Sequence, residues 1–189
     1  MAINIRKNIF ETNSSSTHSL VICPREEDYK YNSLKKMTIK GDYYGRPAPK
    51  ILSETEDKLN YIWTAICDLF LSISWTKDYK VCEIKYTDDF RYWLNELQRM
   101  FPNTNFIVPN KNNVFDIQID HVNELQNFFT KCRNNINILE DLLFEIDSFI
   151  IVESDEHCMT IRCFCPDYWK SEEQFSQLKN GYQVYVKGN

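Results

Sequence analysis

Residues 59–73 restrict the fold of this chain more than any other segment. Their apolar side chains recur at helical spacing: Leu59, Ile62, Trp63, Ile66, Leu69, Phe70 and Ile73. Ser53 and Glu56 stand three residues apart just ahead of them, as in a capping box, so we expect a helix to begin there. The apolar run is shorter than the roughly 20 residues that span a bilayer, and polar residues interrupt it. The segment therefore predicts a helix buried in a protein core.

Shorter helices and strands are expected on both sides of that helix. The helices follow Thr87 up to Pro102, run from a cap at Asp120 through Cys132, run from a capping box at Asn137 and Glu140 through Ile146, and follow Ser171. The strands are expected at 3–10, 20–22, 37–40, 78–86, 104–108, 114–119, 149–152, 159–164 and 182–186. This order predicts an α+β protein in which a mixed or antiparallel sheet packs against about four helices.

The length and the charge of the chain narrow the possibilities further. A chain of 189 residues fits one domain, with 24–50 as an irregular insertion or edge region. The net charge is −5, and it is unevenly spread: residues 1–50 hold nine Lys/Arg and five Asp/Glu, and residues 51–189 hold thirteen and twenty-two. An acidic body is poorly suited to direct nucleic-acid binding. No signal segment or membrane span is apparent, so we expect a cytoplasmic protein that does not bind membranes.

The seven cysteines predict neither a disulfide framework nor a metal site. Their number is odd and their spacing irregular, so we expect most of them to be reduced and buried. His157, Cys158, Cys163 and Cys165 form the densest group, but their spacing is unlike that of structural zinc sites, and we expect no metal. Phosphate loops, nucleophile elbows and dinucleotide fingerprints are missing from the sequence, so no cofactor is expected either.

The most unusual segment is rich in hydroxyl groups and lies between two apolar, strand-like ends. It consists of Asn13, Ser14, Ser15, Ser16, Thr17, His18 and Ser19. Such a segment offers many hydrogen-bonding groups to a phosphate, a sugar or a polar partner surface. The same residues also suit an ordinary loop, because Ser, Thr and Asn bond to their own backbone. Both interpretations remain open from the sequence.

The string FETNSSSTHS at residues 10–19 resembles the opening of a group of bacterial and phage proteins without an established activity. Looser similarities at 61–65, 120–121 and 147–151 extend the resemblance over most of the chain. The resemblance implies a bacterial or phage setting, and it implies no particular chemistry.

Two histidines lie in the segments that carry this resemblance. His18 follows the hydroxyl groups, and His121 follows Asp120, a carboxylate that could orient an imidazole. If His18 and His121 meet, these residues would form a catalytic site with the segment at 13–19 as the ligand-binding part. The alternative is that Asp120 only caps a helix and that His18 only ties a loop to the backbone.

Two functions from different classes are compatible with the sequence. In the first, the chain is a small phage or mobile-element accessory protein that binds and inhibits a host protein, such as a component of bacterial defence. In the second, it is an enzyme that acts on a nucleotide or another phosphate-containing ligand through residues 13–19, Asp120 and His121. The tyrosines and lysines between 29 and 46 could also meet nucleic acid, but an edge strand protected by lysines explains them better.

Overall fold

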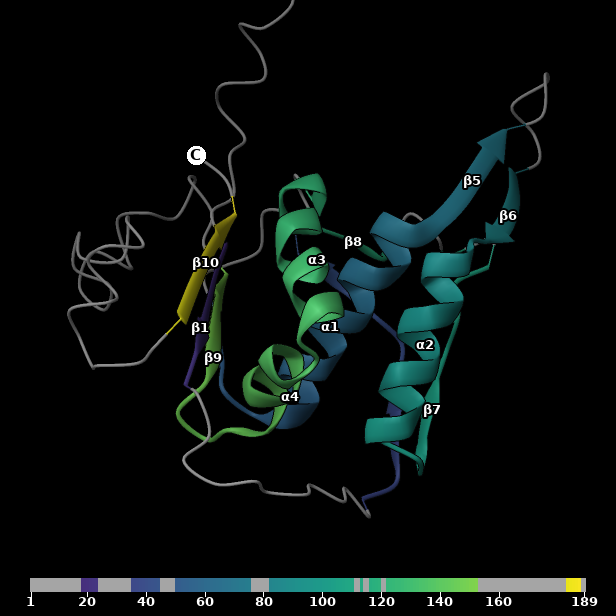
Figure 1. Cartoon of the computed structure of the whole chain (residues 1–189). Coiled ribbons are helices and arrows are strands. Elements are labelled where there is room, and N and C mark those ends of the chain that lie inside the picture. The colour runs from purple at the N-terminus through teal and green to yellow at the C-terminus, as the bar shows by residue number, and fades with distance from the viewer. Residues whose placement is uncertain are drawn as a thin grey trace, which may run out of the picture.

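The computed structural model describes residues 18–23, 35–44, 50–75, 82–110, 113, 116–119, 122–152 and 183–187. Within these residues the protein is an α+β structure with four α-helices (Figure 1). None of the described helices is long and apolar enough to cross a membrane.

The elements follow one another in a mixed order. The helices are α1 (Thr55–Phe70), α2 (Asp88–Met100), the short 3₁₀ helix η3 (Val122–Leu125), α3 (Gln126–Asn134) and α4 (Asn137–Phe144). The strands are β1 (His18–Ile22), β2 (Met37–Ile39), β3 (Tyr43–Tyr44), β4 (Lys50–Leu52), β5 (Leu71–Trp75), β6 (Cys82–Tyr86), β7 (Thr104–Phe106), β8 (Gln118–Ile119), β9 (Phe149–Val152) and β10 (Gln183–Lys187).

Helix α1 lies at the centre of the structure, with the main sheet on one side and α2 on the other (Figure 1). Every residue from Tyr61 to Cys67 is buried, so the helix is covered all round in its middle two turns. Six of these seven residues are fully inaccessible, and Cys67 is 2% exposed. The helix predicted from the periodic apolar residues at 59–73 thus forms the centre of the core.

The main sheet has four antiparallel strands in the order β10-β1-β9-β4. Strand β1 lies in its interior, with His18 opposite Val152 of β9 and Lys187 of β10. Leu20 and Ile22 of β1 join the hydrophobic core together with Ile150 of β9. The sheet therefore brings residues from the two ends of the chain into one layer.

Three two-stranded sheets complete the fold among the described residues. Strands β2 and β7 pair in parallel, as do β3 and β8, whereas β5 and β6 form an antiparallel ribbon. Figure 1 shows this ribbon extending away from the helices. It leaves the body where α1 ends and returns to it where α2 begins.

Several expected element boundaries need correction. The central helix does not continue to Ile73: it ends at Phe70, and Ile73 lies in β5. Neither expected capping box forms, because α1 has Glu54 and α4 has Ile136 at the N-cap, and neither side chain makes a cap hydrogen bond. Strand β8 covers only Gln118–Ile119.

Other expectations are confirmed. Helix α2 begins after Thr87, and β1, β9 and β10 lie where strands are expected. Cys67 and Cys132 are buried and form no disulfide, as expected for small apolar side chains. The expected strands at 3–10 and 159–164 and the helix after Ser171 fall outside the described residues.

Candidate functional site

The structure places only two of the predicted site residues. His18 and Ser19 lie at the start of β1, and both are buried, with 0% and 4% of their surface exposed. The remaining predicted residues are outside the described part of the chain: Asn13, Ser14, Ser15, Ser16, Thr17, Asp120 and His121. The proposed meeting of His18 with His121 therefore stays a prediction.

The histidine and cysteine group at 157–165 also lies outside the described residues. Among the residues that the structure describes, no group of three or more His, Cys, Asp or Glu side chains could hold a metal ion.

The imidazole of His18 is tied to the central helix. Its Nδ1 shares a hydrogen bond of 2.8 Å with the hydroxyl of Tyr61, and the two rings meet edge to face, 5.6 Å between centroids. Tyr61 is fully buried, and desolvation raises the pKa of its phenol well above the usual value of 10.0. The phenol stays neutral over the physiological range, and its hydrogen bond with the imidazole joins β1 to α1.

The polar interior continues from Tyr61 towards β3. The ring of Tyr44 packs edge to face on Tyr61 at 5.0 Å, and its hydroxyl accepts a hydrogen bond of 3.2 Å from the Asn60 amide. Burial raises the pKa of Tyr44 to about 12. Asn60 also accepts the backbone N–H of Gly41, and Thr64 accepts that of Asp42, each at 3.0 Å. These side chains of α1 therefore fix the segment that leads into β3.

Gly41 has a specific reason to be glycine. Its φ of +79° belongs to the left-handed region, which side chains disfavour. A Cβ atom at this position would also lie 2.6 Å from Cγ2 of Ile117. The close approach of this turn to α1 and Ile117 therefore excludes any side chain.

Lys58 is the most unusual charged group in the core, with only 1% of its surface exposed. Its Nζ donates to the backbone carbonyls of Glu145 at 2.9 Å and Ser148 at 2.8 Å, just past the end of α4. Desolvation lowers the pKa of this amine from 10.5 to about 8. A lysine with a lowered pKa can act as a base or nucleophile. Here burial and the two carbonyls instead give it a structural role, since it holds the α4–β9 turn.

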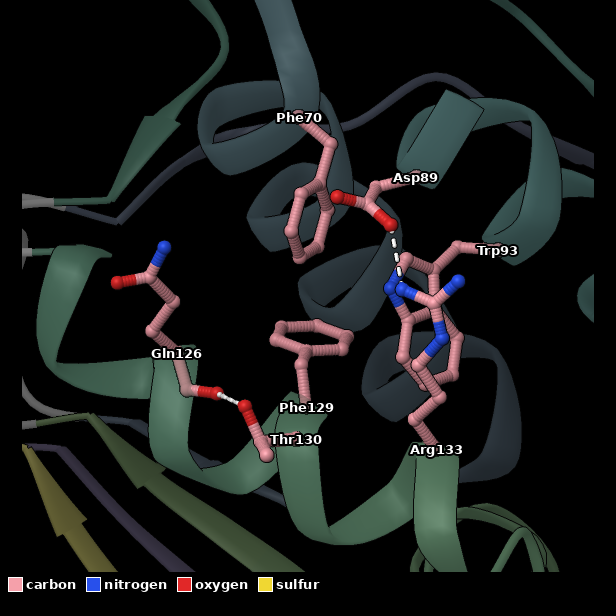
Figure 2. A pocket seen from close by; sticks show the side chains of 7 residues that line it. All are labelled: Phe70, Asp89, Trp93, Gln126, Phe129, Thr130 and Arg133. Atoms are coloured by element: carbon pink, nitrogen blue, oxygen red, sulfur yellow. Dashed lines mark hydrogen bonds and ion pairs between the residues drawn. The ribbon is translucent and has the colours of Figure 1, made fainter. Parts of the chain in front are cut away.

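A pocket opens where α1, α2 and α3 meet. Its lining consists of Phe70, Asp89, Trp93, Gln126, Phe129, Thr130 and Arg133, and its volume is about 160 Å³ (Figure 2). Figure 2 shows the rings of Phe70 and Phe129 pointing towards one another. Their centroids are 5.4 Å apart, and Trp93 lies 5.1 Å from Phe129, so the three rings form one aromatic cluster.

The edge of this pocket is charged. The guanidinium of Arg133 donates to the carboxylate of Asp89, which connects α3 to the first turn of α2 (Figure 2). The same guanidinium lies 4.7 Å from the centre of the Tyr92 ring, as in a cation–π contact. Gln126 and Thr130 line the exposed side. The pocket thus combines an apolar floor with a polar edge.

Sequence reasoning did not find this pocket. Phe70, Trp93 and Phe129 have the spacing of ordinary core residues on three separate helices, and nothing local distinguishes them. Asp89 lies in the first turn of α2, where an acidic side chain favours the helix N-terminus, and this local role does not indicate a pocket. Only the packing of the helices brings these side chains together.

No family model matches this chain, and no match was found among the curated proteins or the solved structures. Any function must therefore be argued from the geometry of the chain itself.

Proposed function

We propose that this chain is a small cytoplasmic accessory protein of phage or mobile-element type that binds a host protein and inhibits it. The observation that supports binding is the pocket between α1, α2 and α3, where three aromatic rings lie beneath a charged edge. The resemblance of residues 10–19 to phage and bacterial proteins supports the biological setting, with a component of bacterial defence as the host target.

The size of the pocket favours a protein partner over a nucleotide. Its volume of about 160 Å³ is well below the roughly 300–1,000 Å³ of most ligand and cofactor sites. A cavity of this size suits one apolar side chain of a partner. Interfaces commonly gain most of their binding energy from a few such anchors, seated in apolar pockets and surrounded by polar contacts. The ion pair of Asp89 and Arg133 would belong to that polar rim.

The charge of the body supports a partner with a basic surface. The pocket residues all come from the part of the chain that holds thirteen Lys/Arg against twenty-two Asp/Glu. Electrostatic complementarity accelerates association and disfavours acidic partners. Proteins that bind nucleic acid carry basic surfaces, so an acidic inhibitor could block one by occupying it.

A pull-down from bacterial lysate tests this proposal if it compares the wild-type protein with a variant whose pocket is blocked. Thr130 is exposed on α3 and lines the pocket, so Thr130→Trp should place an indole over the aromatic floor. Asn127 is exposed on the same helix and does not line the pocket, so Asn127→Trp is the matched control. We expect the wild-type protein and Asn127→Trp to recover the same partner, and Thr130→Trp to lose it.

The recovered protein must then be purified and its own activity measured against increasing amounts of the wild-type chain. Inhibition that Thr130→Trp cannot produce would support the proposal. Equal recovery by all three proteins, or no partner above background, would refute it.

The enzyme hypothesis remains as a second candidate because of one contact. Tyr61 fixes the orientation of the His18 ring, as acid–base catalysis needs. The ring is fully buried, so this proposal also requires an opening that brings a substrate to it. In this proposal Asp120 orients His121, and residues 13–19 bind a phosphate-containing substrate. If His18→Ala and His121→Ala both fold and both leave the biological effect intact, the enzyme hypothesis is wrong.

A further inference from the structure

The ribbon of β5 and β6 has one apolar face and one polar face. Residues that lie opposite one another in an antiparallel pair share a face, and the register pairs Leu71 with Tyr86 and Ile73 with Ile84. The alternate positions pair Ser72 with Lys85 and Ser74 with Glu83. A two-stranded ribbon with such faces normally needs a covering layer or further strands.

The described residues cover this face only in part: Leu71 is buried, Ile84 packs against the core, and the ring of Tyr86 stacks on that of Phe90 at 5.2 Å. Ile73 and Tyr86 keep 36% and 48% of their surface exposed, and Figure 1 shows the ribbon projecting from the body. Among the described strands, β5 is the only one that pairs with β6. The outer edge of β6 therefore presents backbone N–H and C=O groups that another strand can pair with.

In β6, Ile84 lies between two residues of opposite charge. Glu83 and Lys85 flank this residue. Their side chains form an ion pair with each other at 3.5 Å, but they are 64% and 65% exposed, so a second strand can still reach both charges. If two copies of β6 align antiparallel with Ile84 opposite Ile84, Glu83 of each copy faces Lys85 of the other. Opposite charges across neighbouring strands stabilise their pairing. We propose that β6 is a self-association edge, which joins two copies of this chain into one four-stranded antiparallel sheet.

The charges also select this register over its neighbours. A shift by two residues in either direction places Glu83 opposite Glu83 or Lys85 opposite Lys85, which is repulsive. A shift by one residue turns the apolar face of one copy to the polar side. Strand β5 has no such selectivity, because its polar positions are the uncharged Ser72 and Ser74. A second copy thus fits the edge of β6 better than that of β5.

This inference goes beyond the proposed function, since it uses none of the pocket residues. Sedimentation velocity over a range of protein concentrations tests it with four proteins: wild type, Lys85→Glu, Glu83→Lys, and the double variant with both changes. Each single variant makes both cross-strand pairs repulsive, whereas the double variant restores attraction with the charges exchanged. Lys36→Glu, at an exposed position outside the ribbon, controls for the change in net charge.

We expect the wild type and Lys36→Glu to dimerise alike, each single variant to dimerise at least about tenfold more weakly, and the double variant to recover. Circular dichroism of each variant confirms that the fold is kept. A wild type that stays monomeric at every concentration would overturn the proposal. So would a folded Lys85→Glu that dimerises as tightly as wild type, or a double variant no better than the single ones.

Discussion

Lys58 is a buried charged residue that stabilises the core by donating hydrogen bonds to two backbone carbonyls. Its amine lies between α1 and the turn that follows α4, where the last carbonyls of a helix attract positive charge. Burial opposes the charged form and lowers its pKa from 10.5 to about 8. The folded state therefore holds this proton less tightly than the unfolded state does.

This difference predicts a pH dependence of stability. Between about pH 8 and pH 10.5 the unfolded chain keeps the Lys58 proton and the folded chain loses it. The free energy of unfolding of the wild type should therefore rise with pH in this window, relative to Lys58→Met, which cannot titrate. Urea denaturation of both proteins across the window measures it. The raised pKa values of Tyr44 and Tyr61 act in the opposite direction, but they are common to both proteins. Parallel pH curves would contradict the prediction.

The hydrogen bond between His18 and Tyr61 should also contribute to the free energy of unfolding. Tyr61→Phe removes only the hydroxyl, so the Nδ1 atom of a fully buried imidazole loses this hydrogen bond. Leaving a buried polar atom without its partner usually costs about 1–3 kcal/mol, and we expect that loss in the free energy of unfolding. Tyr43→Phe is the control, since Tyr43 is 42% exposed and the change should cost under about 0.5 kcal/mol. Equal effects of the two substitutions would argue against a structural role for this bond.

Thr87 joins the end of α1 to the start of α2. Its hydroxyl donates to the carbonyl of Phe70 at 2.6 Å and accepts the N–H of Phe90 at 3.1 Å. Thr87→Ala should therefore lower the free energy of unfolding by about 1–2 kcal/mol, the usual cost of losing an N-cap. Thr87→Ser keeps the hydroxyl and should retain most of the stability. If chemical denaturation gives the same free energy of unfolding for Thr87→Ala and Thr87→Ser, then neither hydrogen bond of the hydroxyl contributes to stability.

The start of α2 could be predicted because its signals are local. Thr87 caps the helix, and two acidic residues in the first turn favour its positive end. The end of α1 could not be predicted in the same way. Phe70 and Ile73 fit the helical period, while Leu71 and Ile73 equally fit the alternation of a strand. Without a Gly or Pro between them, only the pairing of β5 with β6 decides the boundary.

The candidate pocket was unpredictable for a related reason. Its three aromatic rings come from helices that are distant in the sequence, and each ring alone has the spacing of a core residue. The segment at 13–19 was conspicuous by composition, yet its two described members, His18 and Ser19, are buried in a strand. Unusual composition marked a segment of the chain, whereas tertiary packing determined which side chains form a pocket.

The buried cysteines report on the unfolding of the entire protein. Cys67 and Cys132 expose 2% and 0% of their surface, and burial raises the pKa of both thiols. Since the thiolate is the reactive form, we expect both residues to resist alkylation in the native protein and to react once denaturant unfolds it. Mass spectrometry of the two peptides, with and without urea, measures the difference. Rapid labelling of either cysteine in the native protein would mean that the core around α1 or α3 opens readily.

The interior position of β1 has a consequence for how the protein is made. The ribosome synthesises His18–Ile22 early, but both neighbouring strands, Phe149–Val152 and Gln183–Lys187, come from the far end of the chain. Such distant pairing is slow, because a long loop must close before any contact forms. A nascent chain stalled before residue 149 would leave β1 without either neighbour, so the main sheet can be completed only after residues 149–187 have been synthesised. Synonymous codon changes that alter the pace of synthesis there, or chaperones that bind the exposed strand, would then affect the yield of this protein.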